Sequence, residues 1–409
     1  MLASTILLTL ATSFGDPVAI GTVSAPPLRP GAAVHGGVDR ASTVGPADEL
    51  GVLWRGSRIP MTEVEAQLRA ELPNEWAGSK RGAAAVGEQL ARYANWILDA
   101  EYSVGLSKDA RVVLVTRSAK LGKRRMKVVE STLAAFDEIL SPPDRTGSKE
   151  RFRRAQWGQG DHEPDTSPVM LFEIESRADY ASLVEAAGAV DPALSSWATA
   201  KAEHPGFAEG RLSAAAWQAA PSGFEIGKVW RSENELVNRL SRLLLYRSFG
   251  PQPVWFSLGT AWLLEQEVLG DIYAFPYRYE FVGVGEHKGW KSELRSLFKR
   301  RKDAPLRMEE FAEWRRNTWD DQQAAIAWGM CTFLRQRGPG HLGAFAEASR
   351  LRYKETYRET RPGGSWVTRP DYQLSSDDQL ELLIAETGEN VLSQASGFFT
   401  SWKIPRVRR

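Results

Sequence analysis

The sequence predicts an α+β protein, with a small mixed sheet and its helices in the first part of the chain and a predominantly helical second part. Up to about residue 230, short β-branched runs alternate with stretches whose apolar residues recur at helical spacing. From Ser232 onward, nearly every apolar stretch has helical spacing. The chain has 409 residues, of which 43% are hydrophobic, so it can bury a substantial core.

The first 50 residues are expected to contribute little to this core. The segment "MLASTILLTLATS" (1–13) has an apolar run followed by small residues, which is typical of a short export signal. Residues 14–50 are rich in Pro, Gly and Ala and predict a flexible leader. We therefore expect a protein that is secreted or lies in the periplasm or cell envelope. No later segment reaches the ~18 uninterrupted apolar residues of a membrane-spanning helix, so no transmembrane segment is predicted.

Residues 51–230 predict an N-terminal α/β part. The run "RVVLVTR" is β-branched, as buried strands often are, and the helix after it carries an apolar stripe through Val129, Leu133 and Phe136. The expected elements are, in order, a helix over 81–101, a strand over 111–117, the helix that ends at "SPPD" (141–144), a strand over 168–174, a helix over 177–187 and a strand over 223–230.

Residues 231–409 predict a helical part. Its expected helices are 234–247, 255–268, 324–337 and 377–402. Cys331 is the single cysteine, which excludes an internal disulfide and a multi-cysteine zinc site, and its apolar helix predicts a place in the core. The 15 tryptophans could suggest sugar stacking, but several fall within apolar stretches read as helices and are expected to pack in the core. These are Trp217, Trp255, Trp262 and Trp328.

The stretch "RSENELVNRL" (231–240) has the spacing of a zinc-peptidase helix. Such a helix carries H-E-x-x-H, because positions four apart project from one face and let two imidazoles hold one ion beside a general base. Here the five positions read Asn234, Glu235, Leu236, Val237 and Asn238. The glutamate is kept and both histidines are replaced by asparagine, whose neutral amide oxygen is a poor zinc ligand.

A second segment, "PVWFSLGTAWLLE" (253–265), adds to this pattern. With it, the chain resembles the gluzincin, or peptidase-MA-like, superfamily of thermolysin-type metallopeptidases, in a branch of secreted bacterial proteins. Members follow the zinc helix with "P-x-W-L-x-E-G-x-A-x-x-x-E", whose first Glu is the third zinc ligand. Leu258 stands at that ligand position, twenty residues after Asn238. The residues that match the segment are Pro253, Trp255, Gly259, Ala261 and Glu265.

The resemblance implies a gluzincin-like scaffold that has lost its metal. The former ligand positions would be Asn234, Asn238 and Leu258, and Glu235 would be the vestigial general base. It therefore predicts a catalytically inactive, secreted pseudo-peptidase without zinc or another cofactor. Its partner would be a protein or peptide in the old cleft, paired as an added strand near "FEIGKV" (224–229). A net charge of +1 and scattered basic residues give no reason to expect a nucleic acid.

A purely structural interpretation of Glu235 competes with the vestigial base. Ser232 and Glu235 have the S-x-x-E spacing of a capping box, which would tie down the start of the helix. Glu235 also stands four residues before Arg239, the favourable orientation for an ion pair along a helix. Without a metal or a nucleophile, a general base has nothing to activate, so this interpretation is favoured for Glu235 alone.

Two further functions stay open. An active metallopeptidase would need other ligands, for example His162 or His204 approaching Glu235; the cluster "GDHEPD" (160–165) is otherwise expected to be a solvated loop. An envelope-associated binding or structural protein would use the basic clusters 120–127 and 299–302 on an anionic polymer, although such clusters are commonly solvated faces.

Overall fold

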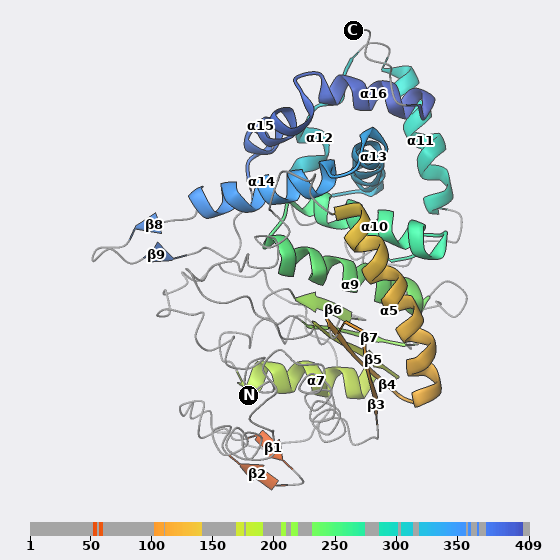
Figure 1. Ribbon diagram of the computed structural model, residues 1–409, viewed down its shortest axis with the longest axis vertical. Helices are drawn as coiled ribbons and strands as arrows, with labels where there is room; N and C mark the ends of the chain where they lie inside the picture. Colours follow the sequence, from red (N-terminus) through yellow and green to blue (C-terminus); the bar gives the residue numbers. More distant parts are fainter. Residues whose placement is uncertain are drawn as a thin grey trace, which may run out of the picture.

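A computed structural model shows a small sheet with its helices in one half of the molecule and a stack of helices in the other, so the predicted α+β class is confirmed (Figure 1). It describes residues 52–54, 57–59, 102–109, 111–140, 169–175, 177–190, 206–209, 214–219, 231–274, 286–301, 304–313, 319–356, 359–360, 366–367 and 374–403. The predictions for 1–13, 14–50, 81–101, 160–165 and 223–230 lie outside these ranges.

The sheet has five strands in the spatial order β3-β4-β5-β7-β6. They are β3 (Ser103–Leu106), β4 (Val112–Thr116), β5 (Val169–Ile174), β6 (Gly206–Glu209) and β7 (Ala214–Gln218). The three central strands run parallel, and each outer strand pairs antiparallel with its neighbour. Two of the three predicted strands, over 111–117 and 168–174, are confirmed as β4 and β5, and all residues of β4 and β5 are buried. This is the environment in which continuous β-branched runs are stable.

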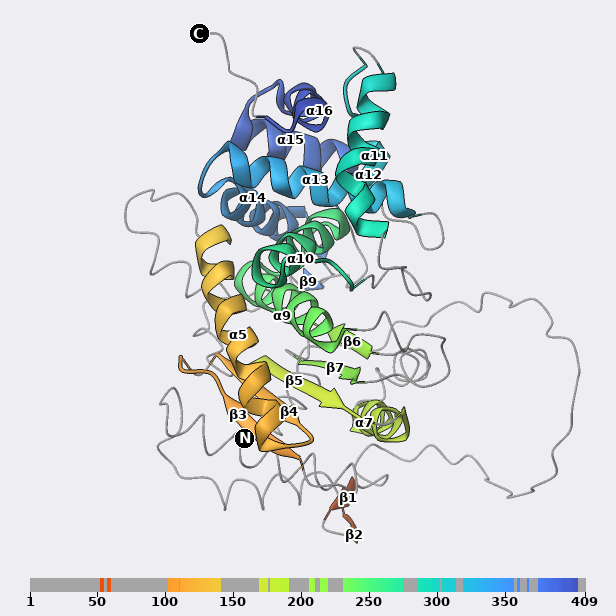
Figure 2. The same ribbon diagram turned by 90° about the vertical axis from the view of Figure 1, so that its right-hand side faces the viewer.

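Helices cover both faces of the sheet (Figures 1 and 2). Helix α7 (Arg177–Val190) lies on one face, and α5 (Ala119–Leu140) and α9 (Ser232–Phe249) lie on the other. The apolar stripe predicted for α5 is buried, with Val129 fully inaccessible and Phe136 4% exposed. Since α9 contacts both the sheet and the helices beyond it, it joins the two halves of the molecule.

The helical half is built on α10 (Val254–Leu269), which packs against α9 on one side and α13 (Asp321–Arg337) on the other. Asp320 caps α13 with a complete capping box, since its side chain accepts from the Gln323 amide and Gln323 reciprocates. The remaining helices are α11 (Glu286–Arg300), α12 (Glu309–Ala312), α14 (His341–Thr356), α15 (Ser376–Thr387) and α16 (Val391–Ser401). Two short hairpins complete the described elements: β1 (Val52–Trp54) with β2 (Ser57–Ile59), and β8 (Glu359–Thr360) with β9 (Trp366–Val367).

Tryptophan packing and two indole hydrogen bonds stabilise the core of the helical half. Trp255 of α10 lies edge-on against Phe311 with ring centroids 5.1 Å apart, and its indole N–H donates to the side-chain oxygen of Gln379 at 2.7 Å. Trp262 donates to the carbonyl of Ala274 at 2.7 Å. The predicted burial of the four tryptophans is confirmed, although Trp217 lies on strand β7 and not on a helix.

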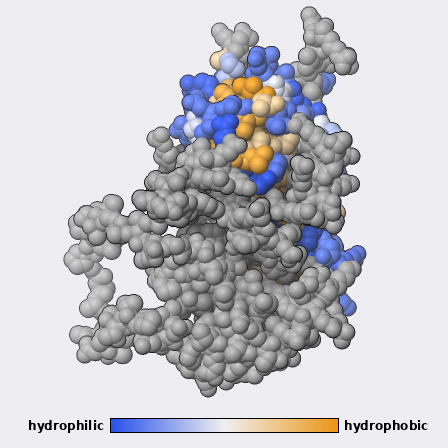
Figure 3. Space-filling view, turned by 60° about the vertical axis from the view of Figure 1, so that its left-hand side comes forward, coloured by the Kyte–Doolittle hydropathy of each residue, from blue (hydrophilic) through white to orange (hydrophobic). Residues whose placement is uncertain are grey.

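The prediction of one continuous helix over 377–402 is wrong, because two helices occupy this range. It is divided into α15 and α16 at Gly388, whose φ of +95° belongs to a left-handed conformation that glycine adopts without strain. On the outer surface of the helical half, apolar side chains gather among hydrophilic ones (Figure 3). Leu351 of α14, 45% exposed, is the one large hydrophobic residue that is exposed in the described part of the chain.

Candidate functional site

The candidate site lies where the first turns of α9 pack against α10. Asn234, Glu235 and Asn238 all lie on α9 and are only 2%, 7% and 1% exposed. Their spacing places Asn234 and Asn238 one turn apart on the same side of the helix. Three polar side chains buried at one helix end need partners from the protein itself.

The two asparagines converge on one carboxylate, that of Glu265 on α10. The Asn234 amide donates to Glu265 Oε2 at 3.0 Å, and the Asn238 amide donates to Oε1 at 2.8 Å. Oε2 also accepts from the backbone N–H groups of Tyr273 and Ala274, at 3.0 and 3.2 Å. Glu265 is fully buried, so this carboxylate joins α9, α10 and the segment after α10 with four hydrogen bonds.

Burial raises the pKa of Glu265 to about 8, and the nearby Glu235 acts in the same direction. The hydrogen bonds from Tyr273, Asn234 and Asn238 oppose this rise, but they do not outweigh the loss of hydration. An ionised carboxylate can accept from all four donors. A protonated one needs an acceptor, which an asparagine supplies by presenting its amide oxygen. The asparagine pair can therefore accommodate Glu265 in either protonation state.

Glu235 points to a different partner, Arg239 of the next turn. The Arg239 Nη2 and Glu235 Oε2 atoms are 2.6 Å apart, and both side chains are less than a tenth exposed. The predicted pair along the helix is thus confirmed, and it is buried. The predicted capping box is wrong, because Arg231 is the residue before the helix and no side chain caps it. The polar end of Glu235 is used by the ion pair.

The guanidinium of Arg239 lies against strand β6. A Cβ atom at Gly206 would stand 2.7 Å from Arg239 Nη2 and 2.7 Å from the carbonyl oxygen of Ala216. A side chain at Gly206 would displace the Ala216 carbonyl or the Arg239 guanidinium, so the close approach of Arg239 to β6 requires glycine at this position. The ion pair of Glu235 is in this way built into the packing of α9 on the sheet.

Leu258, the predicted third ligand position, is 4% exposed and belongs to the apolar core. It lies seven residues before Glu265 on α10, which places the two on the same side of the helix, about 10 Å apart along its axis. Glu265 is the residue of this site that the sequence pattern included without a predicted role. A single acid in the apolar run "AWLLE" was the signal that could have found it.

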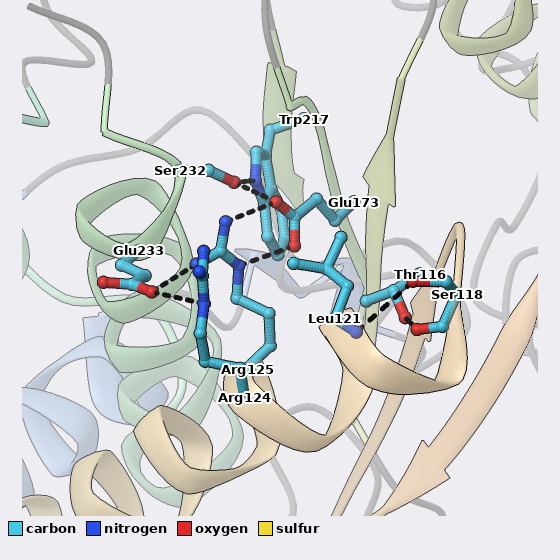
Figure 4. A network of polar contacts seen from close by, with 9 residues as sticks. All are labelled: Thr116, Ser118, Leu121, Arg124, Arg125, Glu173, Trp217, Ser232 and Glu233. Atoms are coloured by element: carbon cyan, nitrogen blue, oxygen red, sulfur yellow. Dashed lines mark hydrogen bonds and ion pairs between the residues drawn. The ribbon is translucent and has the colours of Figure 1, made fainter.

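A second polar network lies beside the first, at the junction of the sheet with α5 and α9 (Figure 4). Arg125 of α5 donates from Nε and Nη2 to both oxygens of Glu173 on β5, at 2.8 and 2.9 Å, and from Nη1 to Glu233. Ser232 donates to Glu173 and accepts from the indole N–H of Trp217 at 2.7 Å. Ser232 is therefore used to join strands to α9 and not to cap it.

The side chains present at the candidate site do not fit a zinc ion. The asparagine amides already donate to Glu265, and the Glu235 carboxylate is neutralised by a guanidinium that would repel a dication. Among the described residues, no group of three His, Cys, Asp or Glu side chains could hold a metal. His162 and His204, the alternative ligands, lie outside the described residues.

Cys331 is buried in α13, where burial raises the pKa of its thiol to about 12, so it is a core residue as predicted and not a thiolate nucleophile. No helix in the described ranges is long and apolar enough to cross a membrane. Comparison with family models, curated proteins and solved structures finds no match to the chain.

Proposed function

We propose that the protein is a catalytically inactive relative of the gluzincin metallopeptidases that binds a protein or peptide. The observation that supports this is the pairing of every polar side chain in the zinc-helix pattern with another protein group. Asn234 and Asn238 donate to Glu265, and Glu235 is held by Arg239. A general base needs a free lone pair directed at water or substrate, and Glu235 has a buried cation there instead.

The arrangement around Glu265 fits the proposed origin. In zinc sites, an imidazole that binds the ion by one nitrogen commonly donates its other N–H to a carboxylate. Glu265 accepts from the side chains at both former histidine positions. In this proposed origin, the Glu265 carboxylate that would have oriented two imidazoles now orients two amides. The carboxylate keeps its hydrogen bonds to these two positions, while the zinc ion is lost.

The proposed binding surface is the edge of the sheet at β6; the segment 224–229, expected from the sequence to pair with a peptide, lies outside the described residues. Strand β6 is the last strand in the order of the described sheet, and α9 packs over it. An extended peptide can add to an edge strand through backbone hydrogen bonds. Export to the cell envelope or medium, predicted from residues 1–13, remains part of the proposal.

The proposed loss of catalysis is tested by measuring the zinc content of the purified full chain and its ability to hydrolyse peptides. We expect less than stoichiometric zinc by atomic absorption and no cleavage of a quenched-fluorescence peptide library with added zinc. Stoichiometric zinc together with cleavage would overturn the proposal and favour an active enzyme with other ligands, such as His162 or His204.

A rebuilt site tests the proposed origin. The triple variant Asn234→His, Asn238→His and Leu258→Glu should bind zinc, because Glu265 would accept the second N–H of the new imidazoles. The double variant that keeps Leu258 is the matched control and should bind zinc more weakly. A folded triple variant that takes up no more zinc than the wild type would contradict the assignment of the three positions.

Hydrogen exchange tests the binding surface. A peptide selected on an array of random 12-residue peptides should slow amide exchange in β6, residues 206–209. Strand β3, residues 103–106, is the opposite edge of the same sheet and serves as the internal control. Protection at β3 alone, or at neither edge, would exclude strand addition at β6.

A further inference from the structure

A row of exposed basic side chains follows the first part of α5. The residues are Lys120, Lys123, Arg124 and Lys127, all exposed, and we call them the α5 basic stripe. Their spacing of three and four residues places them on one side of the helix, with neighbouring Cβ atoms about 5–6 Å apart. The inward side of the same segment carries Gly122, Arg125 and Val129, which are buried.

The charge of this stripe is not balanced within the described structure. Arg124 has a long contact of 3.3 Å to Glu233, a carboxylate that also binds Arg125. The described ion pairs and hydrogen bonds include none from the side chains of Lys120, Lys123 or Lys127, and all three residues are exposed. Like charges at this spacing along a helix destabilise it by a few tenths of a kcal/mol per pair. The stripe therefore lowers the stability of α5, and a bound anion would reverse this effect.

Arg125, in the same basic run, behaves differently. It is buried and bound by two carboxylates, Glu173 and Glu233 (Figure 4). That neutralisation fixes the orientation of α5 on the sheet, and with it the outward direction of the stripe. Four cations are thus presented on a rigid helix whose buried side is held by an ion pair.

The stripe borders a hollow with a volume of about 470 Å³. Lining residues are Ser118, Lys120, Leu121, Lys123, Arg124 and Lys127. This volume falls in the range of small-ligand sites, about 300–1,000 Å³. The wall consists largely of the methylene stems of long side chains, which place several charged ends around one space.

The chemistry of the hollow favours a chain of phosphate groups over a nucleic acid or a membrane surface. The described residues that line it include no aromatic ring on which a nucleic-acid base could stack. Among these described lining residues, Leu121 is the only apolar one and is partly buried, so they do not form the apolar face that holds a helix in a membrane. Ammonium groups bind phosphate oxygens as point charges, and an arginine can add a bidentate contact.

We propose that the α5 basic stripe and its hollow bind a linear ligand with several adjacent phosphate groups. Lys120, Lys123 and Lys127 contact successive phosphates, and Arg124 holds one of them. This site is independent of the proposed peptidase-like function, because it uses another helix face and none of the residues around Glu265.

Sodium tripolyphosphate is the probe, titrated calorimetrically into the full chain. The variant Lys120→Gln, Lys123→Gln and Lys127→Gln should weaken binding by about tenfold or more at about 50 mM salt, and it should make binding less sensitive to added salt. The matched control removes three exposed charges of α11, with Arg295→Gln, Lys299→Gln and Arg300→Gln, and should bind as the wild type does. All six side chains are exposed, so neither variant is expected to melt below the wild-type temperature, and the α5 variant should melt slightly above it because like-charge repulsion is removed.

Three results would overturn the proposal. Tripolyphosphate could fail to bind the wild type, or it could bind the α5 variant as tightly as the wild type. A loss of affinity in the α11 control equal to that in the α5 variant would mean that total charge, and not the stripe, determines binding. Two further arms use oligothymidylate and vesicles of anionic phospholipid. Tighter binding to either, lost in the α5 variant, would assign the stripe to a nucleic acid or a membrane surface instead.

Discussion

Glu173 and Glu265 are both buried next to α9, but they obtain their hydrogen bonds from opposite kinds of partner. Glu173 is held by the guanidinium of Arg125, so its negative charge is cancelled by a cation. Glu265 is held by two amide side chains and two backbone N–H groups, all of them neutral. The arrangement around Glu173 depends on an opposite charge. The arrangement around Glu265 depends on the positions of neutral donors and also accommodates the protonated carboxyl group.

Because of this difference, we expect the two sites to respond differently to substitution and to pH. Glu173 is held by a buried cation, so removal of that cation would leave a buried charge without its closest partner. A carboxyl group among neutral amides can lose its charge without leaving another charge exposed. Substitutions and pH can therefore separate the two sites, and the expected effects range from several kcal/mol to a few tenths.

The largest effect is expected at Arg125. Arg125→Met leaves Glu173 buried without its cation, so the free energy of unfolding should fall by about 3–5 kcal/mol. Urea denaturation followed by tryptophan fluorescence measures this. Arg124→Met is the matched control, because the Arg124 side chain is 65% exposed and its pair with Glu233 should contribute less than about 1 kcal/mol. Equal losses in both variants would contradict a special role for the buried guanidinium.

Glu265→Leu should lower the free energy of unfolding by about 2–4 kcal/mol, because it leaves two amides and two backbone N–H groups without an acceptor. Glu265→Gln should lower it by less than about 1 kcal/mol, since the glutamine oxygen can replace Oε2 and a turned Asn238 amide can accept from its NH₂ group. Denaturation of both variants at one pH gives the comparison. If Glu265→Gln costs as much as Glu265→Leu, the site requires the charge and resembles Glu173.

The pH dependence of stability should also distinguish Glu265. Its pKa is about 8 in the folded protein, while an unfolded glutamate has a pKa of about 4.3. The folded state then binds more protons between these values, so the stabilisation is complete below about pH 4 and is lost as the pH rises through about 8. Between pH 6 and 8, the wild type should lose about 2 kcal/mol relative to Glu265→Gln. A stability difference that stays constant between pH 6 and 8 would mean that the Glu265 carboxyl is already ionised in the folded protein at pH 6.

The smallest effect is expected at Gly206. Gly206→Ala would place a Cβ against the carbonyl of Ala216 and the guanidinium of Arg239, so we expect a loss of about 1–2 kcal/mol. Gly105→Ala in β3 is the control, because its Cβ would meet only the mobile methyl end of Met126, at 3.0 Å, as its close neighbour. Its loss should be a few tenths of a kcal/mol. Thermal denaturation of both variants decides whether the packing of Arg239 on β6 is as tight as the structure indicates.

The predictable part of the fold was the part with strong local signals. Strands β4 and β5 have continuous β-branched runs, and α9, α10 and α13 have clear helical spacing. Strand β7, with the sequence "AAAWQ", has no β-branched residue and becomes a strand only because β5 and β6 pair with it. The short strands β3 and β6 contain glycine and are likewise determined by tertiary pairing.

The candidate site was predictable in its positions but not in its contacts. The spacing of Asn234 and Asn238 indicated that their side chains project from one side of a helix. Their common partner could not be read from spacing, because Glu265 is 27 residues beyond Asn238 and meets it only when α10 packs on α9. Ser232 shows that a local signal can also mislead. Its spacing to Glu235 predicts a capping box, but its hydroxyl donates to the buried carboxylate of Glu173 on β5.

The hydrogen bond from Trp255 to Gln379 has a consequence for the biosynthesis of this protein. It joins residues 124 positions apart, and α15, which carries Gln379, is made when most of the 409 residues have already left the ribosome. Until then the indole N–H of Trp255 has no such acceptor, although the rings of Phe311 and Phe345 that pack on it have already been made. Chains that terminate before α15 should therefore be recognised by proteases even though their sheet is complete.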